Sequence, residues 1–147
     1  MNIFSGVKLK GIDENGDEKE FSLSELSKEL VLYFYPKDNT SVCTKEAIEF
    51  RDKLNKLKSK AIVIGVSPDS VESHKNFRQN HSINFPLLSD PENKLARMLG
   101  VSKETSEHGR KYMSVDRSTF LIKNGLIAKS WKNVNVEGHV DEIIKSL

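Results

Sequence analysis

The residue with the clearest chemical potential is Cys43, the only cysteine among the 147 residues. An apolar and aromatic run over residues 30–35 predicts a buried strand, which stops at Pro36 because proline has no backbone N–H. From residue 44 to about residue 58, apolar residues recur at steps of three and four, as in an amphipathic helix. Free N–H groups and the dipole at a helix N-terminus favour an anion, so Cys43 in the first turn is expected to react as a thiolate. The alternative is an inert thiol that packs as a small hydrophobic residue.

The rest of the chain alternates strand and helix patterns without a linker or a repeat, which is typical of a compact α/β domain. Further strands are expected at residues 7–11, 19–21, 61–66, 118–123 and 126–131, and further helices at residues 71–80, 91–99 and from about residue 137. The sequence therefore predicts one α/β domain over residues 1–147.

Three local signals add detail to these elements. Ser22 and Glu25 have the spacing of a capping box at the start of a brief helix. Asp90 and Pro91 have the residue types that are preferred at the N-cap and at the first position of the helix that follows them. Asn124-Gly125, between two strand patterns, is the strongest short signal for a β-hairpin.

The overall composition argues against several classes of partner. The net charge is +2, and the lysines of residues 53–60 fit the solvent face of a helix, so no nucleic-acid partner is expected. No apolar stretch reaches membrane length, and residues 1–8 lack the features of a signal peptide. We therefore expect no membrane partner and a cytoplasmic location. A single cysteine excludes an internal disulfide.

Pro36, Thr40 and Cys43 form the spacing Pro-x-x-x-Thr-x-x-Cys, which, after a hydrophobic strand, resembles the active-site signature of the peroxiredoxins. Most of the chain resembles the Q-type branch, also called bacterioferritin comigratory protein, with matches at residues 33–40, 85–90 and 117–122. The resemblance implies a thioredoxin-like fold, with a central mixed β-sheet flanked by helices. It also implies a thiol-dependent peroxidase for hydrogen peroxide and organic hydroperoxides. Such an enzyme serves antioxidant defence and cell redox homeostasis, and uses neither a metal nor an organic cofactor.

The resemblance also assigns roles to individual residues. In the family, the arginine in the place of Arg117 lies against the cysteine and stabilises its thiolate. The glutamate in the place of Glu46 orients that arginine, although an exposed helix carboxylate is the alternative for Glu46. Pro36 would shield the thiolate of Cys43 from water. The hydroxyl of Thr40 could donate to a bound hydroperoxide or accept from it, and could also cap the helix.

The chain departs from the Q-type pattern in two places. Where members usually read Thr-Pro-Gly-Cys-Thr, this chain has Ser41 and Val42 before the cysteine, which leaves the loop geometry open. Val42, like Glu46, is expected to be a substrate-binding or supporting residue of the candidate site. Many members carry a resolving cysteine at the position of Ile48, or else on the next helix. With one cysteine, the sulfenic acid must be reduced by an external thiol such as thioredoxin, glutaredoxin or glutathione. The alternative is that a resolving cysteine has been lost by mutation.

A second class of function uses the same fold without turnover. In that alternative the protein is a redox-sensing thiol protein or a binding module that signals through oxidised Cys43, and peroxide turnover separates the two. A disulfide reductase is disfavoured because Cys-x-x-Cys is absent. The four histidines show no ligand pair at metal spacing, and Tyr112 and Trp131 are expected in the core or at a pocket rim. We expect a monomer or a weak homodimer.

Overall fold

The computed structural model describes residues 2–26 and 29–147. Within these ranges a seven-stranded sheet has the strand order β2-β1-β5-β4-β3-β8-β9. Its strands are β1 Lys8–Ile12, β2 Glu18–Ser22, β3 Glu29–Phe34, β4 Ile62–Ser67, β5 Leu87–Ser89, β8 Ser118–Lys123 and β9 Leu126–Trp131. The β3/β4 and β4/β5 pairs are parallel and the other pairs are antiparallel, so the sheet is mixed, as expected.

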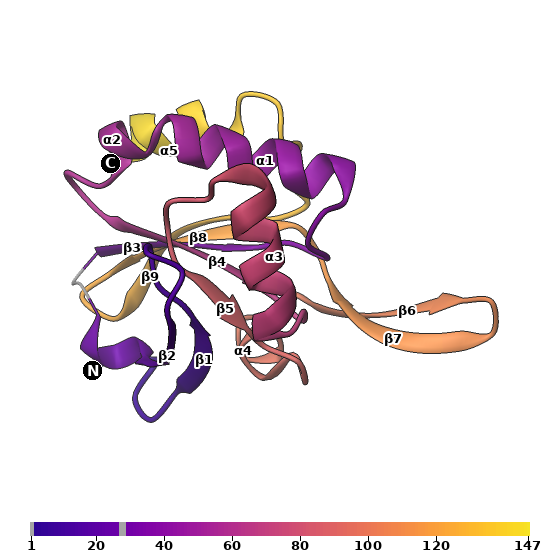
Figure 1. The fold of residues 1–147 in the computed structure, drawn as a ribbon. Helices are drawn as coiled ribbons and strands as arrows, with labels where there is room; N and C mark the ends of the chain where they lie inside the picture. Colours follow the sequence, from indigo (N-terminus) through magenta and orange to yellow (C-terminus); the bar gives the residue numbers. More distant parts are fainter. Residues whose placement is uncertain (1, 27–28) are drawn as a thin grey trace.

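Helices cover both faces of this sheet. They are η1 Leu23–Glu25, a 3₁₀-helix, and the α-helices α1 Ser41–Asp52, α2 Leu54–Leu57, α3 Val71–His81, α4 Lys94–Met98 and α5 His139–Ser146. In Figure 1, α1, α2 and α5 lie together above the sheet, whereas α4 lies on the opposite side. The expected arrangement of a central mixed sheet flanked by helices is confirmed.

The central strand β3 is buried on both faces because its side chains alternate between two hydrophobic clusters. Val31 and Tyr33 pack in the cluster that includes Phe50 of α1, Phe77 of α3 and Ile143 of α5. The intervening residues of β3, Leu30, Leu32 and Phe34, face the other cluster. That cluster also includes residues of η1 and α4. A continuous apolar run is therefore what this strand requires.

Some predicted boundaries are wrong. The helix expected from residue 44 to about residue 58 is two helices, α1 and α2, because the chain leaves helical geometry at Lys53 (φ −103°, ψ 9°). The capping box is also absent: Ser22 makes no side-chain cap hydrogen bond, and η1 is a single 3₁₀ turn.

The expected start of the helix near residue 91 is wrong for a different reason. Helix α4 begins at Lys94, so Asp90 and Pro91 lie before it and not at its N-cap and first position. The Asp90 carboxylate nevertheless accepts hydrogen bonds from the backbone N–H groups of Leu95 and Ala96, each at 3.1 Å from Oδ2. It therefore caps α4 from a turn upstream.

A further hairpin, outside the main sheet, projects from the body of the protein (Figure 1). It consists of β6 Ser102–Glu107 and β7 Arg110–Val115, and it was not predicted. His108 and Gly109 at its tip have φ of 51° and 78°, close to the 52° and 77° of the predicted hairpin turn at Asn124-Gly125. In both turns the second of the two central residues is a glycine, the residue type that adopts a positive φ at the lowest cost in free energy.

Candidate active site

The chain passes from β3 to α1 through a short loop that fixes the position of Cys43. Tyr35 still pairs with the neighbouring strand, since its N–H donates to the Val66 carbonyl at 3.0 Å, and Pro36 then ends the strand. Thr40 is extended (φ −81°, ψ 155°) and occupies the N-cap position of α1. Cys43 is the third residue of the helix and only 2% exposed. The expected place in the first turn is confirmed.

Strand β8 carries the second candidate residue to the same corner. β8 pairs antiparallel with β3, with Ser118 opposite Phe34, so Arg117 lies at the carboxyl end of β3. Its Nη2 donates to Cys43 Sγ at 3.1 Å, and its Nη1 donates to Glu46 Oε1 at 2.7 Å. Glu46 lies one turn after Cys43 on α1. The structure therefore brings Cys43, Arg117 and Glu46 together.

The ion pair between Arg117 and Glu46 is largely out of water. Glu46 is 1% exposed, and burial raises the pKa of its carboxyl to about 7, although Arg117 beside it lowers that pKa. Burial lowers the pKa of Arg117, but Glu46 and Cys43 raise that pKa by more, so the guanidinium keeps its charge. The other oxygen of Glu46, Oε2, has no hydrogen-bond partner among the described residues. Among the described residues, the arginine that contacts the sulfur is thus the only hydrogen-bond partner of the Glu46 carboxylate.

Thr40 and Pro36, on the loop that leads to Cys43, line a groove of about 670 Å³, whereas Cys43, Arg117 and Glu46 do not line it. Besides these two, the groove is lined by Lys37, Pro68, Asp69, Glu107, Tyr112 and Met113. The Thr40 hydroxyl donates to the Lys37 carbonyl at 3.1 Å and does not cap α1, so the expected side-chain cap is wrong. Thr40 is exposed, and Val42, half exposed at 50%, lies on the surface of the same helical turn.

Two aromatic residues were expected in the core or at a pocket rim. Tyr112 is 45% exposed and lines the groove, which makes it a rim residue. Trp131 is partly buried and packs against the cluster around Phe50. The expectation is confirmed for both residues.

The sequence patterns missed a buried polar cluster beneath the loop, formed around Asp38 and His74. The only local signal is that His74 precedes the core residue Phe77 by three positions, which places both on one face of α3. Among the described residues, no group of histidine, cysteine and acidic side chains could hold a metal ion.

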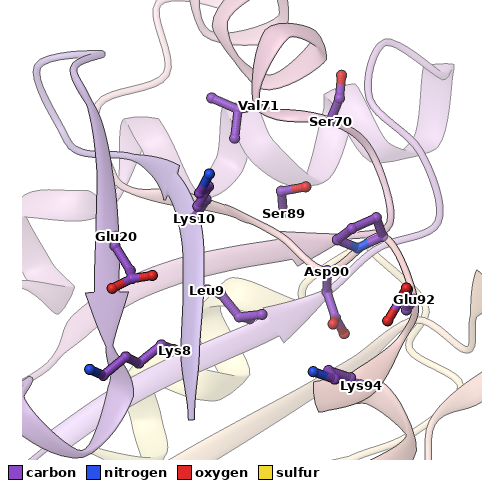
Figure 2. Close-up of a pocket in the computed structure, with 11 residues that line it drawn as sticks. Lys8, Leu9, Lys10, Glu20, Ser70, Val71, Ser89, Asp90, Glu92 and Lys94 are labelled. Atoms are coloured by element: carbon purple, nitrogen blue, oxygen red, sulfur yellow. The ribbon is translucent and has the colours of Figure 1, made fainter.

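A second hollow, of about 440 Å³, lies between β1 and the segment that follows β5 (Figure 2). Its rim carries charges of both signs, with Lys8, Lys10 and Lys94 around the carboxylates of Glu20 and Glu92. None of the candidate site residues lines it. It therefore adds nothing to the chemistry at Cys43.

Comparisons with known proteins agree with this geometry. The family model described as the AhpC/TSA family matches residues 4–130. The chain belongs to the AhpC/TSA family. Two relatives are each 44% identical over 100% of this chain: a putative peroxiredoxin bcp of Coxiella burnetii, over 100% of its length, and peroxiredoxin Bcp of Bacillus subtilis, over 96%. The predicted resemblance to the Bcp branch is confirmed.

Solved structures support the same assignment. Peroxiredoxin Q of Xanthomonas campestris has a TM-score of 0.81 and 36% identity, covering 98% of this chain and 90% of that one. A structure of the Xanthomonas campestris bacterioferritin comigratory protein, described for its alkyl peroxide reduction activity, has a TM-score of 0.80 and 35% identity, with the same coverage. This member of the AhpC/TSA family is a thiol-dependent peroxidase with a thioredoxin-like fold. Within the described part of the chain, no helix has the length and apolar character to cross a membrane.

Proposed function

We propose that Cys43 is the peroxidatic cysteine of this thiol-dependent peroxidase. The observation that carries the proposal is the 3.1 Å contact between Arg117 Nη2 and Cys43 Sγ. A fixed guanidinium beside the sulfur stabilises the thiolate, and it also stabilises charge that develops on a peroxide oxygen during attack. Glu46 holds the guanidinium in that orientation from the neighbouring turn of α1.

The first half of the cycle oxidises Cys43. The thiolate attacks one oxygen of the hydroperoxide, an S–O bond forms and the O–O bond breaks. The electron pair leaves with the second oxygen, which takes up a proton and departs as water or an alcohol. Cys43 is left as a sulfenic acid. Thr40 donates to or accepts from the peroxide on the groove side, while Pro36 and Val42 border the site and limit access of water.

The second half of the cycle needs thiols from outside, because the chain has one cysteine. A first thiol condenses with the sulfenic acid, releasing water and forming a mixed disulfide. A second thiol attacks that disulfide and restores the Cys43 thiol. Because Cys43 is 2% exposed, this exchange requires the first turn of α1 to open. Thioredoxin, glutaredoxin and glutathione are the proposed sources of thiol.

The substrates proposed are hydrogen peroxide and organic hydroperoxides. Pro36, Pro68 and Met113 give the groove that Thr40 lines an apolar surface, which could contact the organic group of a hydroperoxide. The Xanthomonas relative described for alkyl peroxide reduction supports the same proposal. A single domain over residues 1–147, a monomer or weak homodimer, and a cytoplasmic location stay predictions.

Replacement of Cys43 by serine tests the proposal. The two side chains differ little in size, so Cys43→Ser should keep the thermal unfolding midpoint and lose peroxide consumption in the presence of dithiothreitol. Mass spectrometry of the wild type after one equivalent of peroxide should find one added oxygen on Cys43. Activity retained by the serine variant would end the proposal.

The same assay separates an enzyme from a sensor. Thioredoxin, glutaredoxin and glutathione are supplied in turn to the oxidised protein, and repeated peroxide consumption is measured. Oxidation without turnover by any thiol, dithiothreitol included, would favour the redox-sensing alternative.

A further inference from the structure

The loop before Cys43 rests on a buried polar cluster that the peroxidase cycle does not use. At its centre is Asp38, which is 5% exposed. Within the described chain its carboxylate faces two hydroxyl donors and one ring nitrogen. Tyr35 donates from its hydroxyl to Oδ1 at 2.6 Å, Ser73 donates to Oδ2 at 2.8 Å, and Nδ1 of His74 lies 2.7 Å from Oδ2. The cluster joins the loop to helix α3.

The hydrogen bonds of His74 determine where its protons lie. The ring is fully buried, and its Nε2 lies 2.8 Å from the Leu88 carbonyl oxygen. A carbonyl only accepts, so Nε2 carries a proton. Asp38 Oδ2 accepts from Ser73, and a protonated carboxyl oxygen is a poor acceptor, so the proton at the contact between Oδ2 and Nδ1 belongs on Nδ1. His74 and Asp38 are therefore an imidazolium and a carboxylate, with side chains 0% and 1% exposed.

Stability alone does not account for such a pair. Removing two charges from water is costly, and well-packed apolar residues in place of a buried ion pair are often neutral or stabilising. What the pair supplies is a fixed geometry, because each partner has a single arrangement in which its hydrogen bonds are satisfied. A role in positioning is the physical reason to keep it.

The segment that the pair holds is the one that presents the active site. Asp38 is fixed a second time by its backbone N–H, which donates to Asp69 Oδ2 at 2.7 Å. Tyr35, next to Pro36, is fixed by its hydroxyl bond to Asp38 and by its backbone bond to Val66. Thr40, the N-cap of α1, follows Asp38 by two residues. A displacement of Asp38 must therefore move Thr40 and the helical turn that carries the sulfur.

We propose that His74, as an imidazolium, is a positioning residue for peroxide reduction. It clamps Asp38 and so fixes the loop of residues 36–40, which sets the place of Thr40 and of the first turn of α1. The proposal rests on the proposed role of Cys43 as the peroxidatic residue. His74 itself does not touch the peroxide or the sulfur.

Two variants divide the contacts of His74 between them. The amide nitrogen of asparagine is as many bonds from Cβ as Nδ1 of histidine, so His74→Asn can still donate to Asp38. The amide nitrogen of glutamine matches Nε2 in the same way, so His74→Gln keeps Leu88 and loses Asp38. Both variants lose the imidazolium charge. A difference between them therefore reports the contact with Asp38.

The rate constants with hydrogen peroxide and with iodoacetamide are measured for each variant in single turnover. Iodoacetamide reports only the ionisation and access of the thiol, whereas peroxide also needs the positioned donors. We expect His74→Gln to slow the peroxide reaction by about ten- to a hundredfold, as for a displaced catalytic group. Its alkylation rate should change far less, and His74→Asn should lose clearly less of the peroxide rate. Equal losses in both variants, parallel losses with both reagents, or no loss in His74→Gln would overturn the proposal.

A measurement on the wild-type protein remains decisive where a variant does not fold. Nitrogen-15 NMR of the ring should show protons on both nitrogens of His74, and one bare nitrogen would overturn the imidazolium clamp. The two proposals fail in different experiments. Activity in Cys43→Ser, which keeps His74, would end the peroxidatic role of Cys43, whereas the His74 variants and the ring NMR test only the positioning role of His74.

Discussion

Replacing Arg117 with methionine should slow peroxide reduction by more than a return to the ionisation of an ordinary thiol would. An ordinary thiol has a pKa of about 8.5, so about a twentieth of it is thiolate near neutral pH, and a return to that value costs about twentyfold. Loss of one fixed donor to the charge that develops in a transition state costs about a hundred- to a thousandfold. The 3.1 Å contact of Nη2 with Sγ places Arg117 where both effects act.

The assay separates the two effects through pH. The rate constant for hydrogen peroxide is measured across a pH series for the wild type and for Arg117→Met, and iodoacetamide gives the ionised fraction of each. At high pH both thiols are fully ionised, so a remaining difference belongs to the transition state. If the variant then reaches the wild-type rate, Arg117 acts on ionisation alone and the reasoning is refuted.

A matched control is needed because the substitution also leaves Glu46 buried without its partner. Breaking a buried ion pair by removing one side costs about 3–5 kcal/mol of stability. The double variant Arg117→Met, Glu46→Gln carries no such unpaired charge and should be as slow as the single variant. Recovery of the rate in the double variant would assign the loss to a disturbed fold.

Three further results are expected. Because Thr40 is extended and Ser41 begins α1, Ser41→Pro should stabilise the protein by about 0.4–1 kcal/mol in urea unfolding, and a lower midpoint would contradict this fit. Burial raises the pKa of Glu46 from 4.5 to about 7, so the folded state holds a proton that the unfolded chain releases, and stability falls as the pH rises between these values. The contribution is about 3 kcal/mol, and Glu46→Gln should lose this slope in thermal unfolding, whereas parallel curves would show that Glu46 is not its source. Excess peroxide without thiol should add a second oxygen to Cys43, since no second cysteine can trap the sulfenic acid; mass spectrometry that finds only one added oxygen would contradict it.

The elements that the sequence predicts well are those whose pattern is local. The run over residues 30–35 is apolar throughout because β3 is buried on both faces, and that composition is visible without the fold. Asn124-Gly125 has the residue types that a turn with two positive φ values requires. The final helix, expected from about residue 137, begins at His139.

Elements that depend on distant partners were missed. β5 has three residues, Leu87–Ser89, and becomes a strand only because it lies between β1 and β4. The β6–β7 hairpin is largely exposed, so its strands lack the apolar alternation that marks a half-buried strand. Asp90 looked like an adjacent cap, whereas its carboxylate reaches the N–H groups of residues five and six positions later.

The candidate site also has a part that the local sequence predicts and a part that depends on distant residues. Residues 36–43 form a local motif, which places a thiol at the start of a helix. The resemblance to a known family suggested the contact with Arg117, but the β3/β8 register that makes the contact, with Phe34 opposite Ser118, is not written in either segment alone. Beyond its spacing from Phe77, His74 gave no signal, because its partners Asp38 and Leu88 lie 36 and 14 residues away.

The chemistry at Cys43 therefore comes mostly from tertiary structure. A helix start alone can ionise the thiol, and that is worth at most about twentyfold near neutral pH. The larger effect needs a charge held beside the sulfur, and the residue that supplies it, Arg117, is 74 positions further along the chain. Its orientation depends on the carboxylate of Glu46, and because burial raises the pKa of that carboxyl to about 7, the carboxylate form predominates only above that pH. The same thiol in an isolated strand–loop–helix segment would keep the motif and lose most of the rate.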